Sequence, residues 1–162
     1  MINIKNLRVL VHPNKNLRQV AEPIDKITDE IKNVAERMFH LMSSLGGIGL
    51  AAPQVGLPWQ MFVMDTKYTG KMVAINPVLS GFFGGLCIAE EGCLSLPGLL
   101  CDVSRPRIAT LSGLNERGEP FCRVGKDIVS RCWFHELDHC QGVMIIDKAI
   151  GEPRVSQKRY AH

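Results

Sequence analysis

The most regular hydrophobic pattern in the chain lies between residues 28 and 45. Apolar residues recur there three and four positions apart, which is the spacing of one face of an α-helix. Asp29 and Glu30 stand in the first turn, where the helix dipole favours acidic side chains. Gly46 and Gly47 follow the last apolar position, as is common at a helix end. The pattern therefore predicts an amphipathic helix here.

The middle of the chain has a different pattern, with short apolar runs separated by turn-forming residues. Residues 61–64 and 72–75 are such runs and predict two strands, and Asn76-Pro77 is expected to close the second. Residues 108–124 predict a hairpin of two further strands, with its turn at Asn115–Gly118. Together these segments predict an antiparallel sheet of short strands.

A second helix is predicted from about Asp127 to Cys140, with Gly142 just beyond its end. Apolar residues occupy nearly every side of this helix, so we expect it to be buried. An element order of helix, several strands and helix favours an α+β fold over alternating βαβ units. We therefore expect one domain over residues 1–162, in which largely antiparallel short strands pack around the buried helix and the N-terminal helix lies beside them.

The composition narrows the class of protein without identifying it. Hydrophobic residues make up 46% and charged residues 22% of the chain, which is typical of a globular protein. The formal net charge of +3 is small and the basic residues are scattered, so nucleic-acid binding is not expected. No apolar run reaches the ~18 residues of a membrane helix. The N-terminus lacks a signal or transit pattern, which favours a cytoplasmic protein or a processed organellar one.

The pattern of cysteines predicts free thiols and no disulfide framework. None of the six cysteines belongs to a C-x-x-C pair, and without a secretory signal a disulfide framework is not expected. Most should be small core residues. Cys93 is the exception for which we expect another role.

The second predicted helix contains the sequence His135-Glu136-Leu137-Asp138-His139. Two histidines four positions apart lie one turn apart on the same helix face, so both imidazoles can bind one metal ion. Glu136 can then exchange a proton with a water molecule on that ion. The alternative is two core histidines bonded to backbone, with Glu136 on a solvated edge.

A third metal ligand has to come from another part of the chain, because catalytic sites of this kind usually have three protein ligands. Cys93, within Glu90–Pro97, is the best candidate, since a thiolate is a soft ligand that suits a site with two imidazoles. The alternative is that Cys93 is only a small buried residue.

Residues 47–56 form a loop of glycines and small residues. Gln54 is the side chain there that can donate a hydrogen bond, and its amide could face a developing oxyanion beside a backbone N–H. A phosphate-binding loop is disfavoured because no G-x-x-x-x-G-K-[ST] pattern is present. The alternative is a tight connection between a helix and a strand.

Taken together, three segments resemble the three signature motifs of peptide deformylases. They are GIGLAAPQ at 47–54, EGCLS at 91–95 and HELDH at 135–139. Their order and separations are also similar to the family, and the likeness extends from about residue 7 to Asp147. The resemblance implies a metal-dependent hydrolase that removes the formyl group from the N-terminal methionine of new polypeptides and releases formate.

The resemblance also implies roles for individual residues. Cys93, His135 and His139 would bind one divalent metal ion, with Fe²⁺ expected and Zn²⁺ or Ni²⁺ able to occupy the same site. Glu136 would be the general base and acid. The substrate would be the nascent formyl-methionyl polypeptide, which places the reaction near the ribosome.

Five further residues are assigned by the same resemblance. Gln54 and the backbone N–H of Leu94 would polarise the formyl carbonyl, and Gly49 would offer backbone hydrogen bonds to the substrate. Glu91 and Arg105 would form a supporting ion pair.

The same resemblance places Arg131 on the wall of the methionine pocket, beside Ile48, Ile128 and Cys132; with Gly49, these are the residues expected to bind substrate. Arg131 is an unexpected residue on such a wall. Either its stem covers the pocket with the charge outside, or the preference for methionine is altered. The chain stops soon after the second helix, so a long C-terminal helix is not expected.

Two other functions fit the same motifs. A metallopeptidase or another amidohydrolase would use the same chemistry on a substrate without a formyl group. A non-catalytic module that recognises N-terminal methionine would keep the fold, although it would have no need of the proton shuttle Glu136.

Overall fold

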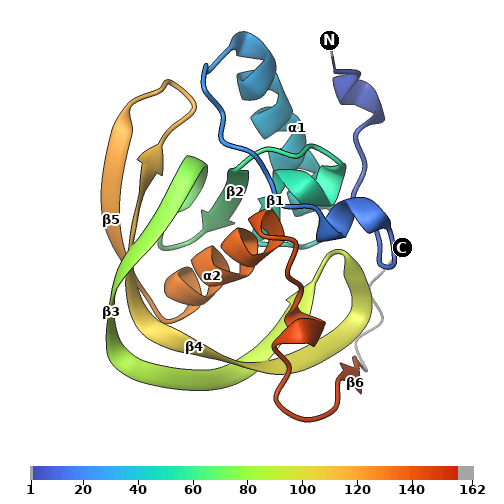
Figure 1. The fold of residues 1–162 in the computed structure, drawn as a ribbon, viewed down its shortest axis with the longest axis vertical. Coiled ribbons are helices and arrows are strands. Elements are labelled where there is room, and N and C mark those ends of the chain that lie inside the picture. The colour runs from blue at the N-terminus through green and yellow to red at the C-terminus, as the bar shows by residue number, and fades with distance from the viewer. Residues whose placement is uncertain (1, 157–162) are drawn as a thin grey trace.

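The computed structural model describes residues 2–156. Two α-helices and six strands follow one another in the order α1, β1 to β5, α2, β6 in this part of the chain (Figure 1). Their bounds are α1 Asp29–Ser44, β1 Gly49–Ala51, β2 Met61–Thr66, β3 Gly70–Cys93, β4 Leu96–Leu114, β5 Pro120–Lys126, α2 Ile128–Cys140 and β6 Arg154–Val155. The expectation about a C-terminal helix concerns residues 157–162, which lie outside the described residues.

The strands form one antiparallel sheet in the order β1-β2-β3-β4-β5, and β6 pairs with β4. The predicted hairpin is confirmed, because Leu114 at the end of β4 pairs with Pro120 at the start of β5. Both predicted helices are also confirmed. The α+β fold class is therefore correct.

The prediction that Asn76-Pro77 closes a short strand is wrong. The ladder between β3 and β4 shifts register between Ile75 and Val78, and β3 then continues to Cys93. Asn76 has a φ of 50°, which is favoured by few residues other than glycine and asparagine, and its side-chain amide is hydrogen-bonded to the backbone of Ile24. A bulge of this kind inserts residues and bends the strand without ending it.

Further register shifts along β3 make the β3–β4 pair strongly curved, and α2 lies on its concave side (Figure 1). Trp133 of α2 is 1% exposed and packs against Gly125 of β5. A Cβ at Gly125 would lie 2.5 Å from the indole ring, so this strand can approach α2 only with glycine at that position. The expected burial of the second helix is confirmed on the face that carries Trp133.

The N-terminal helix α1 covers β1 and β2 at the other end of the molecule (Figure 1). Its buried residues are those of the predicted apolar stripe, among them Val34, Met38 and Met42. No helix in the described part of the chain is long and apolar enough to cross a bilayer.

Candidate metal centre and its surroundings

Three potential metal ligands converge where α2 faces the end of β3. The sulfur of Cys93 lies 3.2 Å from Nε2 of His139, which in turn lies 3.2 Å from Nε2 of His135. All three ligand atoms are within 4.8 Å of one another. The structure therefore brings together the three predicted ligands, although Cys93 precedes the first of the two histidines by 42 positions.

The geometry and chemistry of these residues fit a divalent metal ion. Ligand atoms at ~2.1 Å from a tetrahedral ion lie about 3.4 Å apart, close to the separations seen here. Burial lowers the pKa of His139, which favours the neutral imidazole that a metal needs. Burial also acts to lower the pKa of His135, but hydrogen bonds with Cys93 and Glu91 raise it above the usual range. Cys93 and Glu91 therefore favour positive charge next to His135, whereas burial keeps His139 neutral.

Glu136 lies beside this centre and is 3% exposed. Its Oε2 is buried and has no hydrogen-bond partner among the described residues. Burial raises the pKa of Glu136 to about 7, so the carboxyl can both lose and take up a proton near neutral pH. A Cβ at Gly49 would lie 2.4 Å from its Oε1, so the backbone of β1 can approach this carboxylate only because residue 49 is glycine.

Gln54 is 1% exposed, and hydrogen bonds determine how its amide is oriented. Its Oε1 accepts a hydrogen bond from the Ala51 N–H at 2.8 Å. Its Nε2 therefore points the other way, donating to Ser95 Oγ at 3.1 Å and to Cys93 Sγ at 3.6 Å. The donor end of the amide faces the metal centre. Ser95 is not among the predicted site residues, although its position two residues after Cys93 could have suggested it.

A second group of charged residues lies on the other side of His135. Glu91 and Arg105 form the predicted ion pair, in which Nε and Nη2 of the guanidinium donate to the two carboxylate oxygens at 2.9 and 3.1 Å. Nδ1 of His135 donates to Oε2 of the same carboxylate at 2.9 Å. Burial acts to raise the pKa of Glu91, but hydrogen bonds from His135 and Arg105 outweigh it and lower the pKa to about 2.

Asp138 extends this charged group and is absent from the predicted site residues. It accepts from Arg105 Nη1 at 2.5 Å and from Lys148 Nζ at 2.8 Å. Its place inside the HELDH sequence was visible, but nothing local to it indicated that Arg105 and Lys148 would both approach it.

Arg131 does not place its charge outside the protein, so the first of the two expectations about it is wrong. The residue is 8% exposed, and its guanidinium donates to Glu91 Oε1 at 2.8 Å. It also donates to the backbone carbonyls of Cys87 and Val103, at 2.7 and 2.8 Å. The curved β3–β4 pair provides these acceptors inside the fold, which is why the charge can be buried.

A cavity of about 620 Å³ opens beside the metal centre. Ile48 and Ile128, which are 40% and 43% exposed, lie at its rim. Leu94 also lines the cavity, and its side chain packs against Gly47. The five residues predicted to bind substrate, Ile48, Gly49, Ile128, Arg131 and Cys132, all line this cavity.

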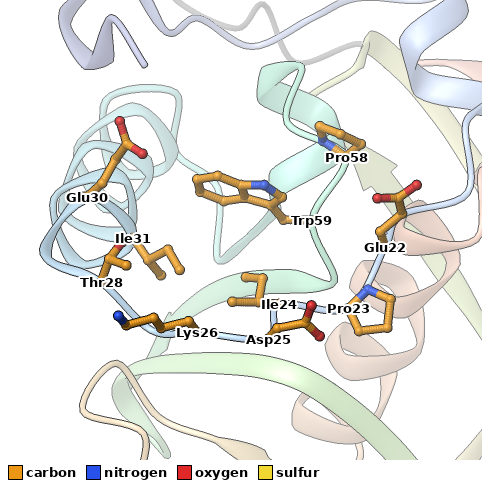
Figure 2. A pocket seen from close by; sticks show the side chains of 10 residues that line it. All are labelled: Glu22, Pro23, Ile24, Asp25, Lys26, Thr28, Glu30, Ile31, Pro58 and Trp59. Carbon is orange, nitrogen blue, oxygen red and sulfur yellow. The ribbon is translucent and has the colours of Figure 1, made fainter. Parts of the chain in front are cut away.

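A smaller hollow of about 310 Å³ lies away from this site, between the start of α1 and the segment before it. Figure 2 shows the indole of Trp59 lying between Glu30 of α1 and the segment that carries Glu22 and Asp25. Its lining contains acidic side chains and Lys26 but no histidine or cysteine. It therefore lacks the ligand set found at the larger cavity.

Comparison with known proteins gives one consistent family. The family model for polypeptide deformylase matches residues 6–154. The peptide deformylase of Picosynechococcus sp. is 42% identical over 149 residues, which cover 90% of this chain and 80% of that protein. The peptide deformylase of Synechocystis sp. is 40% identical over 139 residues, which cover 83% of this chain and 74% of that protein.

Solved structures of the same family are similar throughout the fold. The peptide deformylase of Synechococcus elongatus in complex with actinonin superposes with a TM-score of 0.87 at 38% identity, covering 91% of this chain and 80% of that one. The peptide deformylase of Thermotoga maritima gives a TM-score of 0.86 at 36% identity, covering 90% of this chain and 98% of that one.

Proposed function

This chain belongs to the peptide deformylase family of metal-dependent hydrolases, which remove the formyl group from nascent peptides, and we propose that Cys93, Gln54 and helix α2 carry this reaction. The observation that carries the proposal is the convergence of a thiol and two imidazoles at the edge of one cavity, which Cys93 and His135 line. Beside them lies a buried carboxylate with an oxygen that has no hydrogen-bond partner among the described residues. A binding module would gain nothing from this carboxylate, and its burial would cost stability.

Cys93, His135 and His139 are the proposed ligands of the divalent metal ion that the family uses. When bound, the ion would acidify a water molecule and polarise the formyl oxygen as a Lewis acid. We propose Fe²⁺ as the native ion, following the family resemblance, with Zn²⁺ or Ni²⁺ able to occupy the same ligands. A set of one thiolate and two imidazoles suits all three metals.

Glu136 is the proposed proton carrier. In its ionised form it takes a proton from the attacking water. We assign this step to Oε2 because none of the described residues forms a hydrogen bond with it. The oxygen of that water forms the new bond to the formyl carbon. As the bond between the carbon and the nitrogen breaks, Glu136 returns the proton to the departing amine, leaving formate and a free N-terminus.

Gln54 and Leu94 are proposed to stabilise the negative charge that develops on the formyl oxygen. The Nε2 of Gln54 is preoriented toward the centre by the hydrogen bond between its Oε1 and Ala51. The backbone N–H of Leu94, directly after Cys93, would be the second donor. Donors fixed before the reaction stabilise the transition state without a cost of reorganisation.

The edge strand β1 is proposed to hold the substrate backbone. Among the described strands it pairs only with β2. Its other edge, at Gly49, is therefore free to pair with an extended peptide. The methionine side chain would then enter the cavity between Ile48, Ile128 and Cys132. The stem of Arg131 would form part of that wall.

The substrate also suggests where the protein works. Formyl-methionyl chains emerge from ribosomes, so we place the reaction near the ribosome in the cytoplasm. We also treat residues 1–162 as one domain, since α2 packs against elements from both halves of the chain.

An anaerobic assay of formate release tests this function. The metal-loaded chain should release formate from a formyl-methionyl peptide and leave the acetyl-methionyl peptide intact, and Cys93→Ser should lose metal and rate together. Equal cleavage of both peptides would instead support a general amidohydrolase. A Cys93→Ser variant with parental metal content and rate would remove Cys93 from the site.

A further inference from the structure

Arg131 contacts the carboxylate that orients one of the proposed metal ligands. Glu91 uses Oε2 to accept from Nδ1 of His135 and Oε1 to accept from Nη1 of Arg131, at 2.9 and 2.8 Å. Arg131 and His135 are four positions apart on α2, so one carboxylate spans a full helical turn. The orientation of the imidazole therefore depends on a group that Arg131 also holds.

Arg105 alone does not neutralise the carboxylates around it. Its guanidinium is divided between Glu91 and Asp138, and both of these acids are less than 10% exposed. Lys148 forms an ion pair with Asp138, but the lysine side chain is 42% exposed and its charge is partly screened by solvent. Arg131 is thus the second buried cation in a group with two buried anions. An unpaired buried carboxylate is costly, so a second cation has a clear electrostatic role.

The remaining contacts of Arg131 fasten the strand that carries Glu91. Its guanidinium donates to the carbonyls of Cys87 and Ala89 on β3, at 2.7 and 3.5 Å, and of Val103 on β4, at 2.8 Å. Among the described strands, this part of β3 pairs only with β4, because β2 pairs with residues 70–75. Arg131 therefore links α2 to both strands, and its contacts on β3 lie just before Glu91 and Cys93 in the sequence.

From these contacts we propose that Arg131 is a positioning residue for the metal centre, acting through Glu91 on His135, and not a charged group for substrate recognition. The guanidinium holds the Glu91 carboxylate and the β3 backbone in place, so that the His135 ring keeps its Nε2 directed at Cys93 and His139. Outer residues of this kind orient metal ligands, and their loss typically lowers metal affinity or activity 10- to 100-fold. The inference rests on the proposed function only in taking Cys93, His135 and His139 as ligands of a metal.

Arginine and lysine should differ at this position. A guanidinium can donate to Glu91 and to carbonyls on two strands at once, because its donors are spread over a planar fork. An ammonium at the same place would keep the charge but could not reach all of these acceptors. A methionine would keep most of the apolar stem that lines the cavity and lose every hydrogen bond. The series Arg, Lys, Met therefore separates charge, hydrogen bonding and cavity shape.

The decisive experiment measures metal release, which does not depend on turnover. The parent, Arg131→Met and Arg131→Lys are loaded with Zn²⁺, and release to a chromophoric chelator is followed by stopped flow. We expect release about 10- to 100-fold faster for Arg131→Met and an intermediate rate for Arg131→Lys. Arg107→Met removes an exposed arginine that pairs with Asp127, and it should match the parent within about twofold.

Kinetics with the formyl-methionyl peptide add a second readout. A positioning role predicts a lower kcat with little change in KM, partly restored by lysine. Zinc release at the parental rate in Arg131→Met, with a changed KM, would overturn the inference and return Arg131 to the substrate wall. If Arg131→Met does not fold, as judged by circular dichroism, Arg131→Gln replaces it, and parental zinc release in that variant has the same meaning. A parent that retains no zinc would contradict the proposed metal site itself.

Discussion

Glu91 and Glu136 both lie near His135 and are almost completely buried, yet they have opposite electrostatic surroundings. Glu91 accepts hydrogen bonds from Arg105, Arg131 and His135, and its pKa is lowered to about 2. Glu136 faces the cavity with a carboxylate oxygen that has no partner among the described residues, and its pKa is raised to about 7. Burial acts in the same direction on both groups, so the difference comes from the cations around them.

The comparison assigns a task to each carboxylate. Glu91 stays ionised over the whole physiological range and serves as a fixed acceptor that orients His135. Glu136 can change its protonation state near neutral pH, as a proton carrier must. Two identical side chains thus have different roles because their partners move their pKa values apart. If this division is correct, substitutions of the two carboxylates and of their partners should have different consequences.

Glu136→Gln should remove the proton carrier and leave the metal centre in place. We expect kcat to fall about a thousandfold, equivalent to about 4 kcal/mol, with unchanged metal content. Formate release and metal analysis on the same preparation are the measurements. Glu36→Gln, at an exposed position on α1, is the matched control and should keep the parental rate. A Glu136→Gln variant within tenfold of the parent would mean that another group carries the proton.

Arg105→Met should show how much stability is lost when Glu91 and Asp138 no longer have the buried arginine between them. Glu91 and Asp138 would both lose a buried partner, so we expect the free energy of unfolding to fall by about 3 to 5 kcal/mol. Urea denaturation followed by circular dichroism measures it. Arg117→Met removes an arginine that is 68% exposed and should change stability by less than about 1 kcal/mol. Equal losses in the two variants would contradict the buried network.

The lowered pKa of Glu91 predicts a dependence of stability on pH. A folded-state pKa below the ordinary value stabilises the protein above pH about 4.5, and this contribution is lost as the pH falls from about 4.5 to about 2. At about 1.4 kcal/mol per pKa unit, the loss is about 3 kcal/mol. Unfolding free energies of the parent and Glu91→Gln are to be compared across this range, and the variant should lose less stability on acidification. Equal losses of unfolding free energy in the parent and in Glu91→Gln over this pH range would show that Glu91 does not titrate in this way.

Gly49→Ala should disturb the cavity side without touching the ion pairs. The new Cβ would lie 2.4 Å from Glu136 Oε1 and 2.7 Å from the sulfur of Cys132, so the carboxylate has to move. We expect kcat/KM to fall about a hundredfold, as is typical of a displacement near 1 Å in a catalytic group. Gly70→Ala is the control, because it meets open space at the β2–β3 turn and should affect stability more than rate. A parental kcat/KM in Gly49→Ala would refute the close contact.

Lys148→Met tests the outer end of the charged group and should have the smallest effect. Lys148 pairs with Asp138 at 2.8 Å, but its side chain is 42% exposed and the pairing is screened. We expect a loss of less than about 1 kcal/mol in urea denaturation, far below that of Arg105→Met. A loss as large as that of Arg105→Met would show that Asp138 depends equally on both cations.

Much of the fold and the candidate site could be read from local patterns. The spacing of apolar residues predicted the first helix, Gly142 indicated the end of the second, and the turn at Asn115–Gly118 predicted the β4–β5 hairpin. Two histidines four positions apart lie on one face of any helix, so their joint use of a metal follows from helix geometry alone. These features depend on neighbours within a few residues, and a sequence contains such information directly.

Contacts between distant segments were decided only by the tertiary structure. Asn76-Pro77 has the composition of a strand end, yet its amide bonds to Ile24 and the strand continues. Arg131 was expected to point outward or to change the pocket, because nothing near it in sequence showed that carbonyls of Cys87 and Val103 would lie within reach. Burying a charge is favourable only when acceptors surround it, and those acceptors come from strands about 30 to 45 residues away. The pKa values of Glu91 and Glu136 follow the same rule, because each is set by partners that folding brings close.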